Sequence, residues 1–122
     1  SVYQLIVDVD NVYAAVVPDG GGINYNLVKF DNLDGEIAEQ GAADLSSHIY
    51  SCRSLAYENG YTYVTGTDGS ADSYLLVVDV TESDIYISDS RKIDIPIYIA
   101  GINGQWIYLY DDTGLKRLPL SE

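Results

Sequence analysis

Residues 54–80 read SLAYENGYTYVTGTDGSADSYLLVVDV, and this stretch decides the fold class. It contains an apolar run, the turn Asn59-Gly60, an alternating strand, a Gly/Asp loop and a second apolar run. Two other stretches repeat this plan, LIVDVDNVYAAVVPDGGGINYNLVKFD at 5–31 and IAGINGQWIYLYDDTGLKRL at 99–118. Short apolar or alternating runs between Gly, Asn and Asp turns are typical of antiparallel strands.

The first turns of the three units recur at a regular spacing. Asp10-Asn11, Asn59-Gly60 and Asn103-Gly104 are separated by 49 and then 44 residues. A period in the forties with about four strands per unit is typical of β-propeller blades. We therefore predict an all-β fold of antiparallel strands in three propeller-blade-like repeat units, with eleven strands grouped four, four and three. A β-sandwich built from duplicated hairpins is the alternative.

The repeat divides one all-β domain, residues 1–122, into units of about 1–47, 48–92 and 93–122. The last unit has no fourth strand, and three blades are fewer than the roughly four to eight that close a propeller. The chain is thus expected to be a fragment, or half of a six-bladed ring made by two copies. Open edges at Tyr3–Val9 and Leu115–Leu118 would pair with other strands, so we expect a homo-oligomer or contacts with blades of a parent chain.

The strands of the second unit also resemble a known family. Asn59-Gly60-Tyr61-Thr62-Tyr63-Val64 followed by Leu75-Leu76-Val77-Val78-Asp79-Val80 is similar to the LVIVD-repeat propellers of bacterial and archaeal cell surfaces. The first unit has a degraded version of this motif, and the third has Leu118-Pro119 in place of the closing Asp. The resemblance implies an extracellular or cell-surface module that serves in recognition or adhesion.

The composition excludes some classes of partner. The net charge is −13, from 19 acidic and 6 basic residues, which argues against nucleic acid and against anionic membranes. No apolar run reaches the length of a membrane span. The one cysteine, Cys52, opens an apolar strand and is expected to be a buried, inert thiol.

Aromatic residues alternate along two predicted strands. Tyr61 and Tyr63 share one strand face, and Trp106, Tyr108 and Tyr110 share another. Rings beside Asp and Asn suit carbohydrate recognition, because a sugar stacks on the ring while carboxylates bind its hydroxyls. Packing between strands is the alternative, and contact with another subunit or a surface protein is a third.

Four carboxylates near turns form the candidate metal site. Asp8, Asp10, Asp31 and Asp34 lie in short Asp/Asn/Gly segments, and Ca²⁺ prefers six to eight such hard oxygen ligands. Ordinary turn chemistry is the alternative, because Asp and Asn side chains bond their own backbone. No other cofactor is indicated.

We predict a non-enzymatic surface or extracellular module that serves in adhesion, carbohydrate recognition or structural assembly. The alternative is a part of a propeller-type hydrolase or lyase with an acidic funnel, which would gather polar groups with displaced pKa values in one pocket. Matching positions of the repeat are predicted to form the core: Val7, Val64, Leu76, Val78, Ile99 and Ile107.

Overall fold

The computed structural model describes residues 2–8, 10–16, 26–33, 36–94 and 97–120. These ranges hold eleven strands and no helix, so the predicted all-β fold is confirmed. Among them no helix is present that is long and apolar enough to cross a membrane. The strands are β1 Val2–Val7, β2 Asn11–Val16, β3 Asn26–Leu33, β4 Glu36–Asp44, β5 Ser51–Glu58, β6 Tyr61–Thr67, β7 Ser73–Asp79, β8 Tyr86–Ile93, β9 Tyr98–Ile102, β10 Trp106–Asp111 and β11 Gly114–Pro119.

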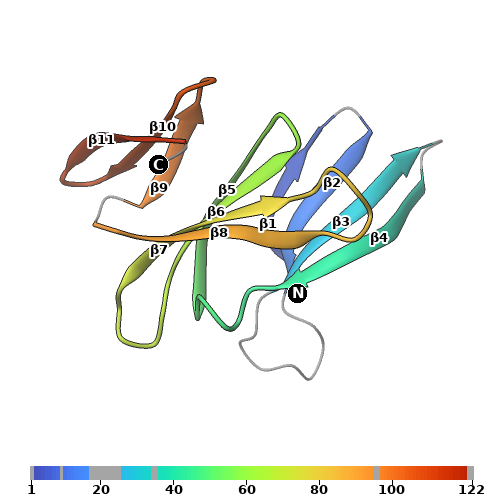
Figure 1. Ribbon diagram of the computed structural model, residues 1–122, viewed down its shortest axis with the longest axis horizontal. Helices are drawn as coiled ribbons and strands as arrows, with labels where there is room; N and C mark the ends of the chain where they lie inside the picture. The colour runs from blue at the N-terminus through green and yellow to red at the C-terminus, as the bar shows by residue number, and fades with distance from the viewer. Residues whose placement is uncertain (1, 9, 17–25, 34–35, 95–96, 121–122) are drawn as a thin grey trace.

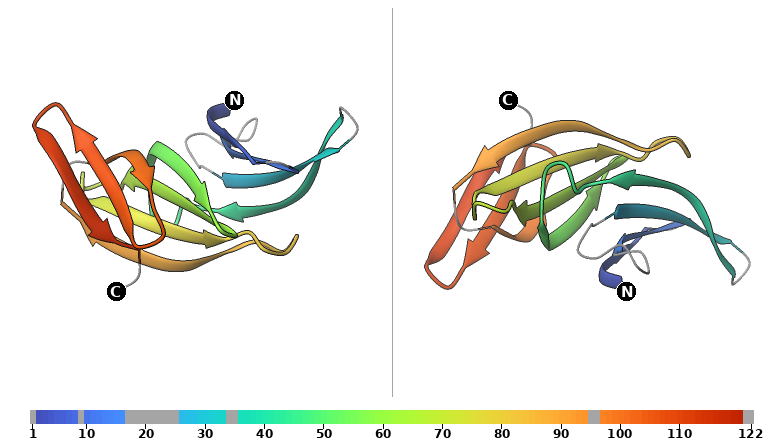
Figure 2. Two further views of the ribbon diagram at one scale, coloured as in Figure 1. Left: turned by 90° about the horizontal axis from the view of Figure 1, so that it is seen from above. Right: turned by 90° about the horizontal axis from the view of Figure 1, so that it is seen from below.

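The strands form three antiparallel sheets in chain order. Sheet 1 contains β1-β2-β3-β4, sheet 2 contains β5-β6-β7-β8, and sheet 3 contains β9-β10-β11. Strand β5 contacts β1 on one side and β9 on the other, while β4 contacts β8. The three sheets follow one another across the molecule, with sheet 2 in the middle (Figures 1 and 2). Successive propeller blades and sandwich-like packing are both consistent with this arrangement.

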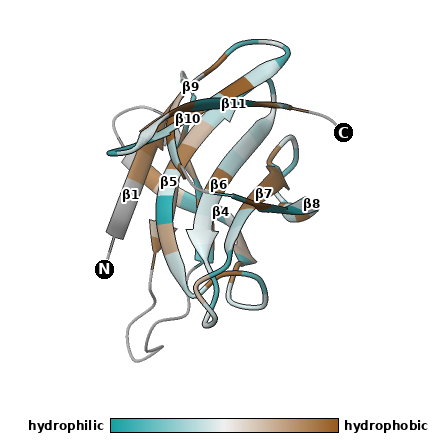
Figure 3. Ribbon diagram, turned by 90° about the vertical axis from the view of Figure 1, so that its left-hand side faces the viewer, coloured by the Kyte–Doolittle hydropathy of each residue, from teal (hydrophilic) through white to brown (hydrophobic). Residues whose placement is uncertain are grey.

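Sheet 2 is packed on both faces, because consecutive residues of its central strands β6 and β7 are buried, including the apolar run Leu75-Leu76-Val77-Val78 of β7 (Figure 3). One face packs against sheet 1 and includes Val64, Leu76 and Val78, each 0 % exposed. The other face packs against Ile107 and Leu109 of sheet 3 through these residues: Tyr63, Leu75, Val77 and Ile93. Two hydrophobic clusters therefore hold the three sheets together.

The turn Asn59-Gly60 is confirmed as a two-residue hairpin between Glu58 and Tyr61. Asn59 has φ 57° and Gly60 has φ 90°, the left-handed pair that a type I′ turn requires. Two other turns differ from prediction by a residue or more. The Asp8 amide donates to the Asn11 carbonyl (2.9 Å), so β2 already begins at Asn11, while Asn103 bonds Trp106 and leaves Gly104-Gln105 at the tip.

The predicted core is mostly correct. Val64, Leu76, Val78 and Ile107 are fully buried, whereas Ile99 is half-buried against sheet 3's core cluster. Val7 was predicted to be buried and is 62 % exposed. It pairs with Val12 on the face of sheet 1 that points away from sheet 2, because a shift of one residue moves a strand side chain to the opposite face.

The outer edges of sheets 1 and 2 meet at a glycine. A Cβ atom on Gly41 would collide with the carbonyl oxygen of Ser83, which lies in the turn between β7 and β8, so any larger residue would force the two sheets apart. Gly41 lies in β4, which continues to Asp44. The sequence also predicts a hairpin turn at Asp34-Gly35 and a loop at 18–22, and both lie outside the described residues.

We predict that Val78→Ala lowers the free energy of unfolding by about 1–3 kcal/mol, because it removes methyl groups from a filled site between sheets. Val7→Ala is the matched control, since the same atoms are removed from a side chain that is 62 % exposed. Denaturant titration of dilute protein measures both changes. Equal losses for the two variants would contradict the assignment of the core.

Candidate functional site

A cleft of about 610 Å³ lies between sheets 2 and 3, beside the Asn59-Gly60 turn. Tyr61 and Tyr63 project from the same face of β6 into this space, as the alternation predicted. The residues that line it are Glu58, Asn59, Tyr61, Tyr63, Val77, Gly104 and Leu120. The first turn of sheet 2, through Asn59, and the first turn of sheet 3, through Gly104, thus both line the cleft.

The two tyrosines have different environments in the cleft. Tyr61 is 36 % exposed at the rim, whereas Tyr63 is 6 % exposed and joins the core between the sheets. Burial raises the pKa of Tyr63, and the nearby Glu58 carboxylate raises it further. The Tyr63 hydroxyl is therefore protonated at neutral pH and is available to donate a hydrogen bond.

Trp106, Tyr108 and Tyr110 lie on a different surface. They alternate with the buried Ile107 and Leu109, so they point to the side of sheet 3 that faces away from sheet 2. The structure therefore separates the five predicted aromatic residues into two places. We define the outer face of sheet 3 by its six members: Tyr98, Trp106, Tyr108, Tyr110, Leu115 and Arg117.

Two contacts already occupy parts of this outer face. The Arg117 guanidinium carbon lies 4.1 Å from the centre of the Trp106 ring, a cation–π contact. The Asn103 side-chain amide donates to the Tyr108 hydroxyl at 3.3 Å. The Trp106 ring is consequently partly covered and is a poorer stacking surface than the sequence predicted.

A second depression, of about 500 Å³, lies at the end of the same face. Tyr98 and Tyr110 are cross-strand partners there, with ring centres 5.7 Å apart and planes tilted by 39°. Asp111 and Asp112 complete its lining. The Thr113 hydroxyl and amide donate to the Asp111 carboxylate and lower its pKa, so this group is held in a turn.

The same turn chemistry explains the other acidic loops. Asp79 accepts from the Thr81 amide and hydroxyl, and Asp44 accepts in the same way from Ser46. These hydrogen bonds lower the pKa values of both carboxyl groups. An Asp two residues before a Ser or Thr is therefore a repeated loop device in this chain.

The predicted calcium ligands are not gathered by the described residues. No group of three or more His, Cys, Asp or Glu side chains that could hold a metal is found in the described ranges. Asp8 is half-buried, Asp10 is exposed, and Asp31 pairs with Asn11 across β2 and β3. Asp34 lies outside the described residues, so a site that includes it stays a prediction.

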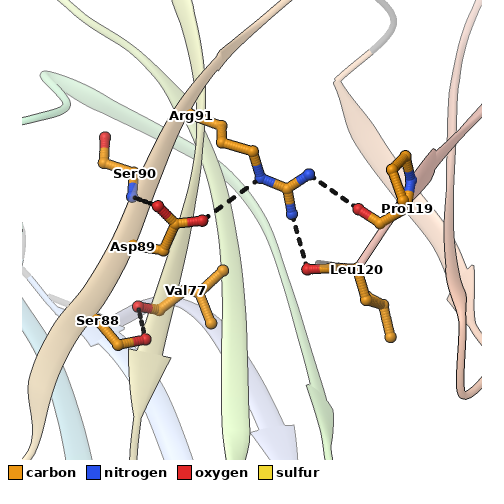
Figure 4. Close-up of polar contacts among 7 residues, drawn as sticks. All are labelled: Val77, Ser88, Asp89, Ser90, Arg91, Pro119 and Leu120. Atoms are coloured by element: carbon orange, nitrogen blue, oxygen red, sulfur yellow. Dashed lines mark hydrogen bonds and ion pairs between the residues drawn. The ribbon is translucent and has the colours of Figure 1, made fainter. Parts of the chain in front are cut away.

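A buried arginine ties sheet 2 to the last residues of sheet 3 (Figure 4). Arg91 is 9 % exposed, and its two terminal nitrogens donate to the carbonyls of Pro119 (2.8 Å) and Leu120 (2.9 Å). Its Nε lies 3.6 Å from the Asp89 carboxylate. Since Leu120 also lines the cleft, Arg91 fixes one of the cleft walls.

Sequence reasoning missed Arg91, Glu58 and Tyr98. Glu58 was not singled out, since it only precedes a turn, yet that turn holds it opposite Tyr61 at the cleft. Tyr98 joins Tyr110 only through the β9–β10 register. For Arg91 the sequence offered no signal, because the carbonyls that it binds, those of Pro119 and Leu120, belong to a distant part of the chain.

The Cys52 thiol is no candidate nucleophile. It packs beside the cluster between sheets 1 and 2, and burial raises its pKa to about 12. The reactive thiolate is therefore scarce at neutral pH, as expected for an inert cysteine.

No protein-family model, no curated protein and no solved structure matches this chain. Its function is therefore inferred from its own residues and their geometry.

We predict that excess Ca²⁺ leaves the melting temperature unchanged relative to excess chelator. The described acidic loops use their carboxylates in turns, and a ligand stabilises a fold only by binding its native state. Differential scanning fluorimetry measures the difference. A rise of several degrees with Ca²⁺ that Asp31→Asn abolishes would instead establish the metal site.

We predict that Arg91→Ala lowers the free energy of unfolding by about 1.5–3 kcal/mol, the usual contribution of hydrogen bonds from a charged donor. Lys92→Ala is the neighbouring control, because Lys92 is exposed and makes only a surface ion pair with Asp72 (3.4 Å). Chemical denaturation compares the two variants. A loss for Lys92→Ala as large as that for Arg91→Ala would contradict the role of this contact.

Proposed function

We propose that the chain is a non-enzymatic binding module of an extracellular or cell-surface protein, built from blades of a β-propeller. The proposed ligand is a neutral carbohydrate, bound in the cleft between sheets 2 and 3. The observation that carries the proposal is the grouping of an exposed tyrosine ring, a carboxylate, an amide and a buried phenol around one cleft.

Each of these groups has a use in binding a sugar. The exposed ring of Tyr61 offers a flat apolar surface on which the C–H face of a pyranose can stack. Glu58 and Asn59 supply acceptors for hydroxyl groups, and the protonated Tyr63 hydroxyl supplies a donor. A few convergent polar groups in a mostly apolar cleft are typical of small-ligand sites.

The negative net charge of the chain favours uncharged sugars as ligands. A chain with net charge −13 repels anionic ligands, and the cleft itself carries the Glu58 carboxylate. Neutral oligosaccharides are therefore favoured over sulfated or sialylated ones.

The propeller assignment is supported by how the sheets meet. The first strands β1, β5 and β9 are neighbours, as are the fourth strands β4 and β8, which is the order expected around a propeller axis. The resemblance of Asn59–Val64 and Leu75–Val80 to LVIVD repeats supports the same fold and a role in surface recognition or adhesion.

The three carboxyl groups with lowered pKa values are held in turns by Ser or Thr. Asp44, Asp79 and Asp111 have pKa values lowered by Ser and Thr hydrogen bonds, the opposite of the change that makes a carboxyl group a general acid. The hydrolase or lyase alternative gains no support from these groups.

We predict that the protein binds neutral oligosaccharides on a glycan array, and that calorimetry with the best of them shows little dependence on salt. Tyr61→Ala should weaken the affinity at least about tenfold, which corresponds to roughly 1.4 kcal/mol. Tyr50→Ala is the control, because Tyr50 is 56 % exposed at the opposite end of sheet 2.

The proposal fails if no neutral oligosaccharide binds. It also fails if Tyr61→Ala and Tyr50→Ala have equal affinities, since the cleft would then play no part.

A further inference from the structure

The three sheets carry an equivalent tyrosine on their second strand. Asn11, Tyr61 and Trp106 each open the pairing of second and third strands, and the tyrosine lies two residues later: Tyr13, Tyr63 and Tyr108. Opposite these tyrosines on the third strand lie Lys29, Val77 and Arg117, in the same order. The register therefore makes Arg117 of sheet 3 the counterpart of Lys29 of sheet 1.

In sheets 1 and 2 this tyrosine is covered by the next sheet. Tyr13 is 2 % exposed and stacks on Tyr57 of sheet 2, with ring centres 5.0 Å apart and planes 11° from parallel. Tyr63 is 6 % exposed and packs with Ile107 and Leu109 of sheet 3. In sheets 1 and 2, therefore, the face that carries this tyrosine packs against the next sheet along the chain.

The cation beside Tyr13 reinforces the first of these contacts. Lys29 is 7 % exposed, and its ammonium donates to the Val80 carbonyl (2.8 Å) and the Glu82 carbonyl (3.4 Å) of sheet 2. Val80 directly follows the third strand of that sheet. A buried cation therefore binds the carbonyls at the end of the next sheet's third strand.

On sheet 3, the equivalent face, which bears Tyr108, is not covered by any described sheet. Tyr108 remains partly exposed, and Arg117 lies over Trp106 on the surface. At the other end of the molecule, sheet 1 has an outer face that points away from sheet 2. We define that face by these residues: Leu5, Val7, Val12, Ala14, Val28, Phe30 and Ile37.

The exposed hydrophobic side chains concentrate on these two faces. Of the nine large ones in the described residues, six lie there: Leu5, Val7 and Ile37 on sheet 1, and Tyr98, Tyr110 and Leu115 on sheet 3. In sheet 1 they surround a centre that is already buried, since Val12, Ala14 and Val28 are 6 % exposed or less. Clustered exposed apolar groups mark contact surfaces.

We propose that the outer face of sheet 3 binds the outer face of sheet 1 of a second copy of this chain, and that two copies close into one ring. The interfaces between sheets 1 and 2 and between sheets 2 and 3 each join the tyrosine-bearing face of one sheet to the opposite face of the next sheet. The proposed contact between copies has the same arrangement. Head-to-tail contacts close when their rotations complete a circle, and two copies supply six sheets, within the range of closed propellers.

The register also assigns a partner to Arg117. The pairs Asn11–Asp31 and Tyr61–Asp79 are equivalent, so Asn32 is the counterpart of Val80. In the closed pair, the Arg117 guanidinium leaves Trp106 and donates to the Asn32 carbonyl of the second copy, as Lys29 does to Val80. This inference goes beyond carbohydrate binding, because it uses neither Glu58 nor Tyr61.

Sedimentation velocity across a concentration series tests the proposal. We expect the mass to rise from one chain to two and then to stay constant. Arg117→Glu should raise the dissociation constant at least about tenfold, and Val7→Asp should do the same from the opposite face. Tyr50→Ser is the control, because Tyr50 is equally exposed but lies on neither face.

Both test residues are exposed, so the variants should retain the circular dichroism spectrum of the parent. Mixing the two variants sharpens the test, because each retains one intact face and a single interface can still form between them. A mass of one chain at every concentration overturns the proposal. So does a pair that tolerates Val7→Asp, which would join two sheet 3 faces, or a mass that grows beyond two chains.

Discussion

The burial of sheet 2 on both faces is the constraint on which the rest of the structure depends. Its central strands β6 and β7 are covered by sheet 1 on one side and by sheet 3 on the other. A sheet buried on both faces needs apolar residues at consecutive positions, and Leu75-Leu76-Val77-Val78 supplies them. In the described part of the chain, no further sheet packs on the outer face of sheet 1 or of sheet 3, so we expect both to depend on this middle layer.

Two hydrogen-bonded side chains connect neighbouring sheets in addition to the apolar packing. Lys29 connects sheet 1 to the end of β7, and Arg91 connects sheet 2 to the end of β11. Both side chains bind backbone carbonyls, which a sheet presents where a strand ends and ladder pairing stops. The chain has only 6 basic residues, and two of them serve as buried hydrogen-bond donors that connect neighbouring sheets.

The arrangement of the three sheets also explains where the candidate binding surfaces lie. The first turns of sheets 2 and 3 both line the cleft, through Asn59 and Gly104. The equivalent tyrosine on the second strand of each sheet is core where another sheet packs on it, as for Tyr63, and is partly exposed where no described sheet covers it, as for Tyr108. One sequence pattern thus produces both core residues and exposed aromatic residues.

Much of the fold could be predicted from the sequence. Local turn chemistry fixed Asn59-Gly60, and alternation placed Trp106, Tyr108 and Tyr110 on one face. Sheet-to-sheet contacts could not be predicted, because they join residues distant in the chain, such as Lys29 and Val80. For the same reason, the two predicted aromatic strand faces could not be placed relative to each other, and the structure shows that sheet 3 lies between them.

The candidate metal site shows a second limit. Carboxylates at alternate positions suit both an ion and a turn, and the difference depends on which hydroxyl lies two residues later. Thr81 and Thr113 supply it for Asp79 and Asp111, and the resulting bonds lower the pKa of each carboxyl group. The pattern Asp-x-Ser/Thr therefore indicates turn chemistry for Asp79 and Asp111, but none of the predicted ligands Asp8, Asp10, Asp31 and Asp34 has a Ser or Thr two residues later.

Native-state hydrogen exchange of the dilute chain tests the central role of sheet 2 most directly. Amides of β6 and β7 should exchange slowest and only through global unfolding, because both faces of these strands are covered. Amides of β11, an edge strand on sheet 3, should exchange through cheaper local opening. Protection in β6 and β7 equal to or lower than that in β11 would contradict the account, because the outer sheets would then be stable without the middle one.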